Sequence, residues 1–168
     1  MSRITYEEAL ARARRIRLIA MDVDGALTDG RIIYSSGGRE TKCFHVRDGY
    51  GIALAIHRGL KIVWISGRQS QITTDRAAEL GVTHVIQGRF DKLEVLTNLA
   101  GELDVALDEV AFIGDDVIDN AAIAACGLGV AVADAHPDTL AAARWVTTHP
   151  GGKGAVRELV DLVLKARA

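Results

Sequence analysis

The stretch "IRLIAMDVDGALTDG", residues 16–30, runs from an apolar segment directly into clustered carboxylates. Within it, residues 17–21 have the nearly continuous apolar pattern of a strand that is buried on both faces, as in a parallel sheet. Asp22 and Asp24 follow at once, and Asp29 comes soon after. Carboxylates held this close repel one another unless a cation lies among them. The stretch therefore predicts a buried strand that leads into a charged site.

The same succession of a short apolar run and a helical pattern recurs along the chain. The expected strands are residues 17–21, 61–66, 83–87, 109–114 and 129–133. The expected helices are residues 49–58, 69–80, 91–102 and 118–126, followed by an amphipathic segment at 154–168. Alternating strands and helices predict a doubly wound α/β fold with a parallel sheet, whose ligands bind at the carboxyl ends of the strands. From the length of the chain we expect a single domain over residues 1–168.

One segment departs from this alternation. Residues 31–46 place two extended runs around the sequence Ser-Ser-Gly-Gly, which is typical of a β-hairpin. Because the segment follows the first acidic cluster directly, we expect it to project over the mouth of the site. A hairpin that only decorates the edge of the sheet is the alternative, and the residues leave both possibilities open.

The composition is that of an ordinary globular protein, with 49% hydrophobic and 25% charged residues. A net charge of -2 gives no basic signature for binding nucleic acid or an anionic membrane. No apolar run approaches the ~18 residues of a membrane span, and residues 1–17 lack the apolar centre of a secretory signal. Cys43 and Cys126 share no metal-binding spacing, so we expect small buried or half-buried thiols in a reducing cytoplasm.

Polar residues also follow the later expected strands. Ser66 ends the second strand, Lys92 opens a helix after the third, and "GDDVID", residues 114–119, closes the fourth. In a parallel sheet these ends meet along one edge. Helix capping explains any single aspartate, but five aspartates at two strand ends require a cation. Oxygen ligands without Cys or His favour Mg²⁺ where phosphate is also bound.

The remaining polar groups suit an anion. Lys92, Ser66 and the backbone N–H groups after Ser66 are positive or donate hydrogen bonds at a helix start. A metal ion, a lysine and a hydroxyl beside a free carboxylate are what phosphoryl transfer requires. The residues thus predict that one aspartate attacks phosphorus to form an aspartyl-phosphate, while its neighbour moves protons.

Four motifs, "DVDGALTDG", "SGR", Lys92 and "GDDVID", closely resemble in this order those of the haloacid dehalogenase superfamily of phosphatases. The resemblance covers nearly the whole chain. It implies that Asp22 is the nucleophile and a metal ligand. It also implies that Asp24 is the general acid and base and that Asp24 binds the metal through its carbonyl oxygen.

The same resemblance assigns the later motifs. It implies that Ser66 and Lys92 hold the phosphoryl group and that Asp115 binds Mg²⁺ directly. Either Asp116 or Asp119 would act on the metal through water or orient Lys92. The expected metal-binding residues are Asp22, Asp24, Asp115 and Asp116.

The spacing of the motifs indicates which branch of the superfamily the chain resembles. Only 36 residues lie between Asp24 and Lys61, and only 25 lie between Ser66 and Lys92, so neither interval holds a cap domain. The chain therefore resembles the capless branch of the superfamily, whose members assemble as tetramers and cover the site with a neighbour's hairpin. This implies a homotetramer and a functional role for residues 31–46.

Within that branch, residues 44–52, 132–137 and 151–158 look like those of phosphatases that act on an eight-carbon sugar acid phosphate of lipopolysaccharide synthesis. A nine-carbon, sialic-type sugar acid phosphate is the alternative substrate. An anionic sugar acid needs cationic or N–H partners. For Arg68 and Arg76, solvated surface charges remain the alternative. The expected substrate-binding residues are Thr28, Arg47, Asp48, Gly49, Gly67, Arg68 and Arg76.

Two functions of other classes compete with a phosphatase. A receiver-type signalling module also combines acidic residues, a hydroxyl and a lysine, but its acceptor aspartate ends a later strand. Here an aspartate two residues after the expected nucleophile, together with the late "GDD", fits a hydrolase instead. A catalytically silent subunit is disfavoured because none of the expected catalytic positions is substituted. Multiple turnover on an aryl phosphate with Mg²⁺ separates the three.

Overall fold

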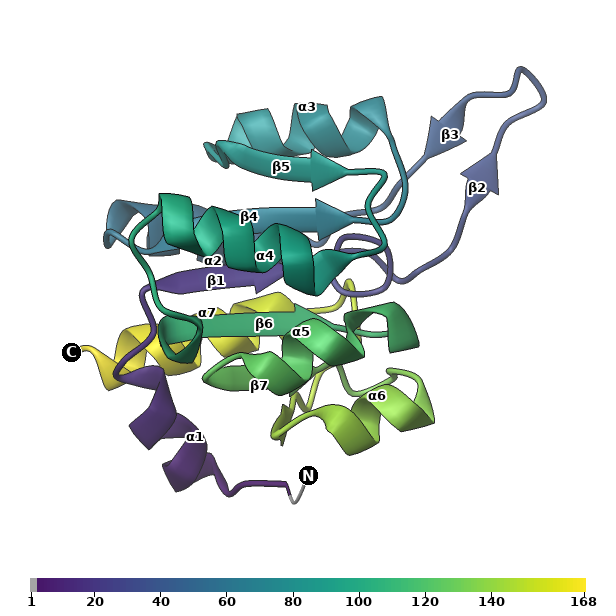
Figure 1. Cartoon of the computed structure of the whole chain (residues 1–168). Helices are drawn as coiled ribbons and strands as arrows, with labels where there is room; N and C mark the ends of the chain where they lie inside the picture. The colour runs from purple at the N-terminus through teal and green to yellow at the C-terminus, as the bar shows by residue number, and fades with distance from the viewer. Residues whose placement is uncertain (1–2) are drawn as a thin grey trace.

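The computed structural model describes residues 3–168 and contains a parallel sheet of six strands in the order β5-β4-β1-β6-β7-β8 (Figure 1). The strands are β1 (Leu18–Met21), β4 (Lys61–Ser66), β5 (His84–Gln87), β6 (Val110–Gly114), β7 (Leu128–Ala131) and β8 (Trp145–Val146). The order reverses at β1, which lies between β4 and β6. In doubly wound sheets the crevice at such a reversal is where ligands bind.

Helices cover both faces of this sheet. They are α1 (Tyr6–Ala13), α2 (Val46–His57), α3 (Gln71–Leu80), α4 (Lys92–Glu102), α5 (Asn120–Ala125), α6 (Pro137–Ala142) and α7 (Ala155–Ala166), with short 3-10 turns at Leu107–Glu109 and Val117–Asp119. In Figure 1, α4 and α5 lie on one face, and α2 and α7 lie behind the sheet on the other. The predicted doubly wound α/β fold is confirmed.

Burial of the central strands explains why these runs form a sheet. All four residues of β1 are fully buried, and so are five of the six residues of β4. Helix α7 adds an apolar face of Leu159, Val160 and Val163 on one side. Each such side chain removed from water contributes roughly 1.5–3 kcal/mol. The strands are therefore held rigidly, and the residues that follow them are positioned by the core.

Some elements differ from the expectation. Helix α2 begins at Val46 rather than at residue 49, because His45 caps it by accepting the N–H of Arg47. Helix α1 was not predicted, although Thr5 and Glu8 form a capping box that is visible in the sequence. Strand β8, with two residues, and α6, with six, are too short to show a periodic pattern.

The hairpin consists of β2 (Ile33–Tyr34) and β3 (Glu40–Thr41), which pair in antiparallel register. It leaves the body of the molecule beyond the carboxyl ends of the parallel strands (Figure 1). This confirms the hairpin expected within residues 31–46, except that Val46 belongs to α2. Both residues of β2 are exposed. The hairpin thus stands at the edge of the sheet where the aspartates gather.

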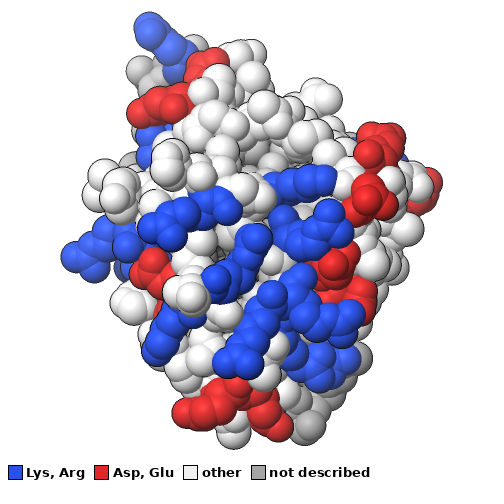
Figure 2. Space-filling model, turned by 90° about the vertical axis from the view of Figure 1, so that its left-hand side faces the viewer, with Lys and Arg blue, Asp and Glu red and all other residues white. Residues whose placement is uncertain are grey.

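Charge is distributed unevenly over the molecule. Figure 2 shows the side on which the strands begin, where lysine and arginine side chains gather. Arg15 and Arg17, just before β1, form ion pairs with Asp108 and Glu109. The acidic residues after β1 and β6 lie at the opposite edge of the sheet. Within residues 3–168, no helix has the length and apolar character needed to cross a bilayer.

Candidate active site

The site is built on the central position of β1. Met21, its last residue, is paired with Trp64 of β4 and with Ile113 of β6. Asp22 continues this line, and its N–H donates to the carbonyl oxygen of Ile113 at 3.0 Å. The side chain of Asp22 therefore lies between the ends of two neighbouring strands, as the parallel sheet predicts.

Lys92 joins the first and the last acidic segments. Its side chain is fully buried, and its ammonium donates to Asp22 Oδ1 and, at 2.6 Å, to Asp119 Oδ1. Burial alone would lower the pKa of Lys92, but the charges of Asp22 and Asp119 hold that pKa above its usual range. Lys92 is therefore a fixed positive charge at the centre of the site.

Within residues 3–168, three carboxylates form a group that can hold a metal ion. Oxygen atoms of Asp22, Asp115 and Asp119 all lie within 4.8 Å of one another. Burial raises the pKa of Asp22 to about 6, with a further increase from the charge of Asp119. Burial and the charge of Asp22 raise the pKa of Asp115 to about 8. An all-oxygen set with this excess of negative charge fits a hard divalent cation such as Mg²⁺.

Asp119, and not Asp116, completes this group. Asp119 Oδ2 accepts the N–H groups of Asp115 and Asp116 at 3.0 and 3.2 Å, which fixes the turn after β6. Asp116 is exposed, and its Oδ1 accepts the N–H of Val117 at 2.7 Å. The carboxylate of Asp116 caps a 3-10 turn and lies outside this group, so the metal-binding role expected for Asp116 stays a prediction without a contact to support it.

A glycine allows the two acidic segments to approach. Gly25 has φ +110°, and a Cβ added there would lie 2.0 Å from Asp115 Oδ2. Any larger residue would push the loop after β1 away from Asp115. The glycine of "DVDG" is therefore required by the close packing of the site as well as by its backbone conformation.

The residues after β4 face the same crevice edge. Ser66 is buried, and its Oγ accepts the N–H of Arg68 at 3.1 Å. Gly67 leaves room for the ring of Phe90, which a Cβ would meet at 3.0 Å. Thr28 is buried in the loop after β1, where its Oγ1 accepts N–H groups of that loop. Thr28 therefore shapes the loop from within.

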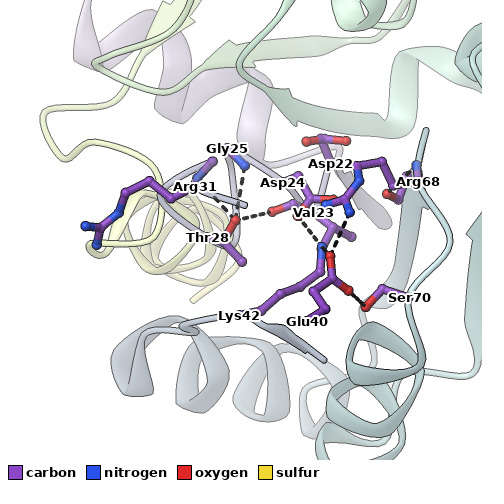
Figure 3. A network of polar contacts seen from close by, with 12 residues as sticks. Asp22, Val23, Asp24, Gly25, Thr28, Arg31, Glu40, Lys42, Arg68 and Ser70 are labelled. Carbon is purple, nitrogen blue, oxygen red and sulfur yellow. Dashed lines mark hydrogen bonds and ion pairs between the residues drawn. The ribbon is translucent and has the colours of Figure 1, made fainter. Parts of the chain in front are cut away.

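The base of the hairpin contributes a second polar network (Figure 3). The ammonium of Lys42 forms an ion pair with Asp24 Oδ1. Glu40 accepts hydrogen bonds from Ser70 Oγ at 2.6 Å and from Arg68 Nη2 at 2.7 Å. The hydrogen bond from Ser70, and that from Arg68, hold the pKa of Glu40 below its usual range. The hairpin is thus tied to the site of its own chain.

The sequence motifs do not include Lys42, Glu40 or Ser70. The available signal was an alternation of period two, since Glu40, Lys42 and Phe44 all turn toward the body of the protein. Phe44 stacks on the buried ring of Trp64 with 6.2 Å between centroids. Exposed residues lie between Glu40, Lys42 and Phe44, so residues 40–44 resemble an ordinary strand at the surface.

Asp48, Gly49 and Arg76, for which contact with substrate was expected, make contacts within the protein that account for their positions. The buried carboxylate of Asp48 accepts N–H groups of Gly154 at 3.1 Å and Arg157 at 2.7 Å, at the start of α7. Arg76 donates to Glu79 at 2.7 Å, and a Cβ on Gly49 would lie 2.3 Å from Arg76 Nη2. We therefore leave these three residues out of the proposed substrate site.

Arg47 lies apart from the aspartates. It lines a separate cavity of about 460 Å³ between α1, α2 and α7, together with His149, Arg157 and Lys165. The structure therefore brings Asp22, Lys92, Asp115 and Asp119 together, places Ser66 after the adjacent strand, and leaves Arg47 outside this set.

The model of the haloacid dehalogenase-like hydrolase family matches residues 70–159, more than half of the chain. The chain belongs to the haloacid dehalogenase-like hydrolases. The resemblance stated from the motifs is confirmed, and the family match includes Lys92, Asp115 and Asp119.

Curated haloacid dehalogenase-like relatives match almost end to end. The 3-deoxy-D-manno-octulosonate 8-phosphate phosphatase of Escherichia coli K12 is 46% identical over 160 residues, which cover 95% of this chain and 85% of the relative. The enzyme of the same name from Yersinia pestis is 47% identical over 161 residues, which cover 96% and 86%.

Solved structures of the family share this fold. A crystal structure of 3-deoxy-D-manno-octulosonate 8-phosphate phosphatase from Moraxella catarrhalis, in complex with a magnesium ion, a phosphate ion and a KDO molecule, has a TM-score of 0.94 at 45% identity. The match covers 96% of this chain and 92% of that one. The cobalt-bound phosphatase from Haemophilus influenzae has a TM-score of 0.89 at 39% identity, covering 93% and 91%.

Proposed function

We propose that this protein is a Mg²⁺-dependent phosphatase that hydrolyses 3-deoxy-D-manno-octulosonate 8-phosphate, an eight-carbon sugar acid phosphate. One observation carries the proposal. The group of Asp22, Asp115 and Asp119 is joined by the buried Lys92, in a chain that is 46% identical to phosphatases named for that substrate. A silent subunit would not need this complete set, and a receiver module would carry its acceptor aspartate after a later strand, whereas Asp22 follows β1.

Asp22 is the nucleophile of the proposed reaction. A carboxylate oxygen of Asp22 forms a bond to phosphorus as the bond from phosphorus to the sugar oxygen breaks, which gives an aspartyl-phosphate. Lys92, Ser66 and the N–H groups after Ser66 hold the oxygens of the transferring phosphoryl group. The buried position of Lys92 against Asp22 supports this role, because a fixed charge stabilises the reacting group without reorganisation.

Asp24 moves the protons. It donates a proton to the departing sugar oxygen and then accepts one from the water that attacks the aspartyl-phosphate. Its position two residues after the nucleophile and its partly exposed side chain, 18% accessible, support access to both sugar and water. The second step releases inorganic phosphate and regenerates Asp22.

The metal site consists of Asp22, Asp115 and Asp119, with the carbonyl oxygen of Asp24 as a further ligand. Mg²⁺ bound there supplies the positive charge that lets ionised carboxylates and a phosphate dianion occupy one place. Burial, with mutual repulsion added to it, raises the pKa values of Asp22 and Asp115 in the absence of a cation, which supports this assignment.

Groups at the mouth of the site select the substrate. Arg68 reaches within 3.9 Å of Asp24 and is partly exposed, which supports a contact with the anionic sugar acid. Thr28 and Gly67 shape the two loops beside it. Arg47 remains a candidate only if a neighbouring chain in the assembly supplies the rest of its site.

The assembly and the cellular place are also proposals. We expect one domain over residues 1–168 and a homotetramer in which the hairpin covers a neighbour's site. The exposed apolar side chains of Ile33 and Tyr34 on the hairpin support a contact of this kind. Cys43 and Cys126 are both free thiols, which supports a reducing cytoplasm.

A phosphate-release assay with a panel of sugar acid phosphates tests the proposal. We expect multiple turnover on the eight-carbon substrate with Mg²⁺, a smaller kcat/KM on nine-carbon sialic-type 9-phosphates, and loss of activity with a chelator. Asp22→Asn should abolish turnover while the protein stays folded. Higher kcat/KM on the nine-carbon compounds would reassign the substrate, and a stable phosphoprotein without turnover would identify a receiver.

A further inference from the structure

Lys42 is a buried cation that links the hairpin to Asp24 (Figure 3). Its side chain is only 2% exposed, and its ammonium donates to Asp24 Oδ1, while Glu40 Oε1 lies 4.0 Å away. A buried ammonium needs an opposite charge to offset the loss of water. The folded structure therefore depends on this buried ion pair, whereas the exposed ion pairs on the surface contribute little to stability.

The two carboxylate oxygens of Asp24 have different surroundings. Oδ1 is held by Lys42, whereas Oδ2 is buried and has no hydrogen-bond partner among residues 3–168. Arg68 Nη1 lies 3.9 Å from Oδ2, beyond hydrogen-bond distance. A buried polar atom without a partner is uncommon and calls for an explanation. Because Lys42 occupies Oδ1, Oδ2 is the oxygen of Asp24 that still has its hydrogen-bonding capacity free for a reacting group.

We propose that Lys42 is a positioning residue for the phosphatase reaction, which anchors Oδ1 of Asp24 so that Oδ2 exchanges the proton with the sugar oxygen and with water. The inference rests on the proposed function, in which Asp24 is the acid and base. It also gives the hairpin a role in its own chain, separate from covering a neighbour.

The proton balance of both steps passes through Oδ2. As the bond from Asp22 to phosphorus forms and the bond from phosphorus to the sugar breaks, the proton on Asp24 Oδ2 moves to the departing sugar oxygen. As water then attacks phosphorus, one of its protons moves to Oδ2 and the bond to Asp22 breaks. Lys42 keeps its own protons throughout.

Glu40 holds the base of the hairpin in place for this contact. Its two oxygens accept from Ser70 Oγ and Arg68 Nη2, and Ser70 N donates to Gln87 Oε1 at 2.7 Å in β5. Lys42 is therefore presented by a segment that is anchored to the sheet. An acid misplaced by about 1 Å can lose roughly a hundredfold in rate, so such anchoring matters to catalysis.

The test compares two leaving groups in Lys42→Met. For the sugar phosphate, whose alkoxide leaving group needs a proton, we expect kcat to fall about tenfold to a hundredfold with KM little changed. For 4-nitrophenyl phosphate, rapid mixing should show a burst of nitrophenolate at nearly the unsubstituted rate, because a nitrophenolate leaves without protonation. The later steady-state rate should fall, since water attack also uses Asp24.

The experiment on Lys42 also includes three further variants and the unsubstituted protein. Lys42→Arg keeps the charge and should restore most of the turnover, and Lys42→Gln serves if Lys42→Met does not fold. Lys61→Met is the matched control, because Lys61 is a half-buried lysine that bonds Leu103 at the opposite edge of the sheet. Lys61→Met should leave the turnover of both substrates unchanged.

Two results would overturn the role of Lys42. One is equal loss of the burst and of sugar phosphate turnover, which would indicate a general structural defect. The other is unchanged kcat in both Lys42→Met and Lys42→Gln while the unsubstituted protein remains active. Absence of turnover by the unsubstituted protein would refute the proposed phosphatase and, with it, this role.

Discussion

Lys92 and Asp22, which are 70 residues apart in the chain, form an ion pair in which neither side chain exceeds 4% exposure. Asp119, which follows the neighbouring strand β6, binds the same ammonium. The lysine thus neutralises part of the charge of a carboxylate cluster that a parallel sheet has gathered. Stability and the proposed chemistry depend on the same contact, which makes it the first target for substitution.

Lys92→Met should destabilise the metal-free protein. It leaves Asp22 and Asp119 buried without their cation, and breaking a buried pair in this way costs about 3–5 kcal/mol. Urea unfolding in the presence of a chelator near pH 8 measures the difference. Lys153→Met, which changes an exposed lysine, is the control and should unfold like the parent. Equal unfolding free energies for Lys92→Met and the parent would contradict the importance of the pair.

Asp119→Asn and Asp116→Asn should separate the two candidates for the metal site. Asp119 lies in the carboxylate group and Asp116 caps a turn. Removing the charge of Asp119 should weaken Mg²⁺ binding by about tenfold or more, whereas Asp116→Asn should leave it nearly unchanged. The Mg²⁺ dependence of phosphate release and calorimetric titration measure both. A larger loss in Asp116→Asn would mean that the metal lies elsewhere.

Mg²⁺ should stabilise the protein more strongly as pH rises. In the metal-free protein, burial raises the pKa of Asp22 from 3.8 to about 6 and that of Asp115 to about 8. A carboxyl whose pKa is raised by folding contributes stability below its unfolded pKa, and that contribution is lost as pH rises through the folded value. The metal-free protein should therefore lose stability from about pH 4, near the unfolded pKa, up to about pH 8, the folded pKa of Asp115.

Melting temperatures with Mg²⁺ and with a chelator, measured across this pH range, check that prediction. The difference between the two curves should widen toward high pH, because the cation binds the ionised carboxylates and binding to the folded state adds stability. Asp115→Asn should narrow the difference. A constant gap would show that these carboxylates do not titrate in the metal-free protein.

The fold followed from local patterns wherever those patterns were long enough. Five of the strands and the longer helices after residue 46 have the expected type, because buried parallel strands are continuously apolar and helices keep one apolar face. Strand β8 was not predicted because two residues are too few to show a periodic pattern. The start of α2 moved because the side chain of His45 provides a cap.

Only some residues of the site could be predicted from the sequence. Asp22 and Lys92 were identified because each directly follows or precedes a regular element, so the direction of the strand fixes where the side chain lies. The contacts of Asp48 could not be predicted because its partners, the N–H groups of Gly154 and Arg157, come from the far end of the chain. Lys42 was missed because its burial depends on how the hairpin docks.

The sequence by itself determined the sheet, its polar edge and the chemical types of the groups there, since these depend on periodicity and on residues next to strand ends. Only the tertiary structure placed Asp119 beside Asp22 and Asp115, left Asp116 exposed, and brought Lys42 to Asp24. Those outcomes depend on side-chain directions in a tight turn and on a hairpin packed against a distant loop. Contacts of that kind arise between segments whose separation in the chain carries no local signal.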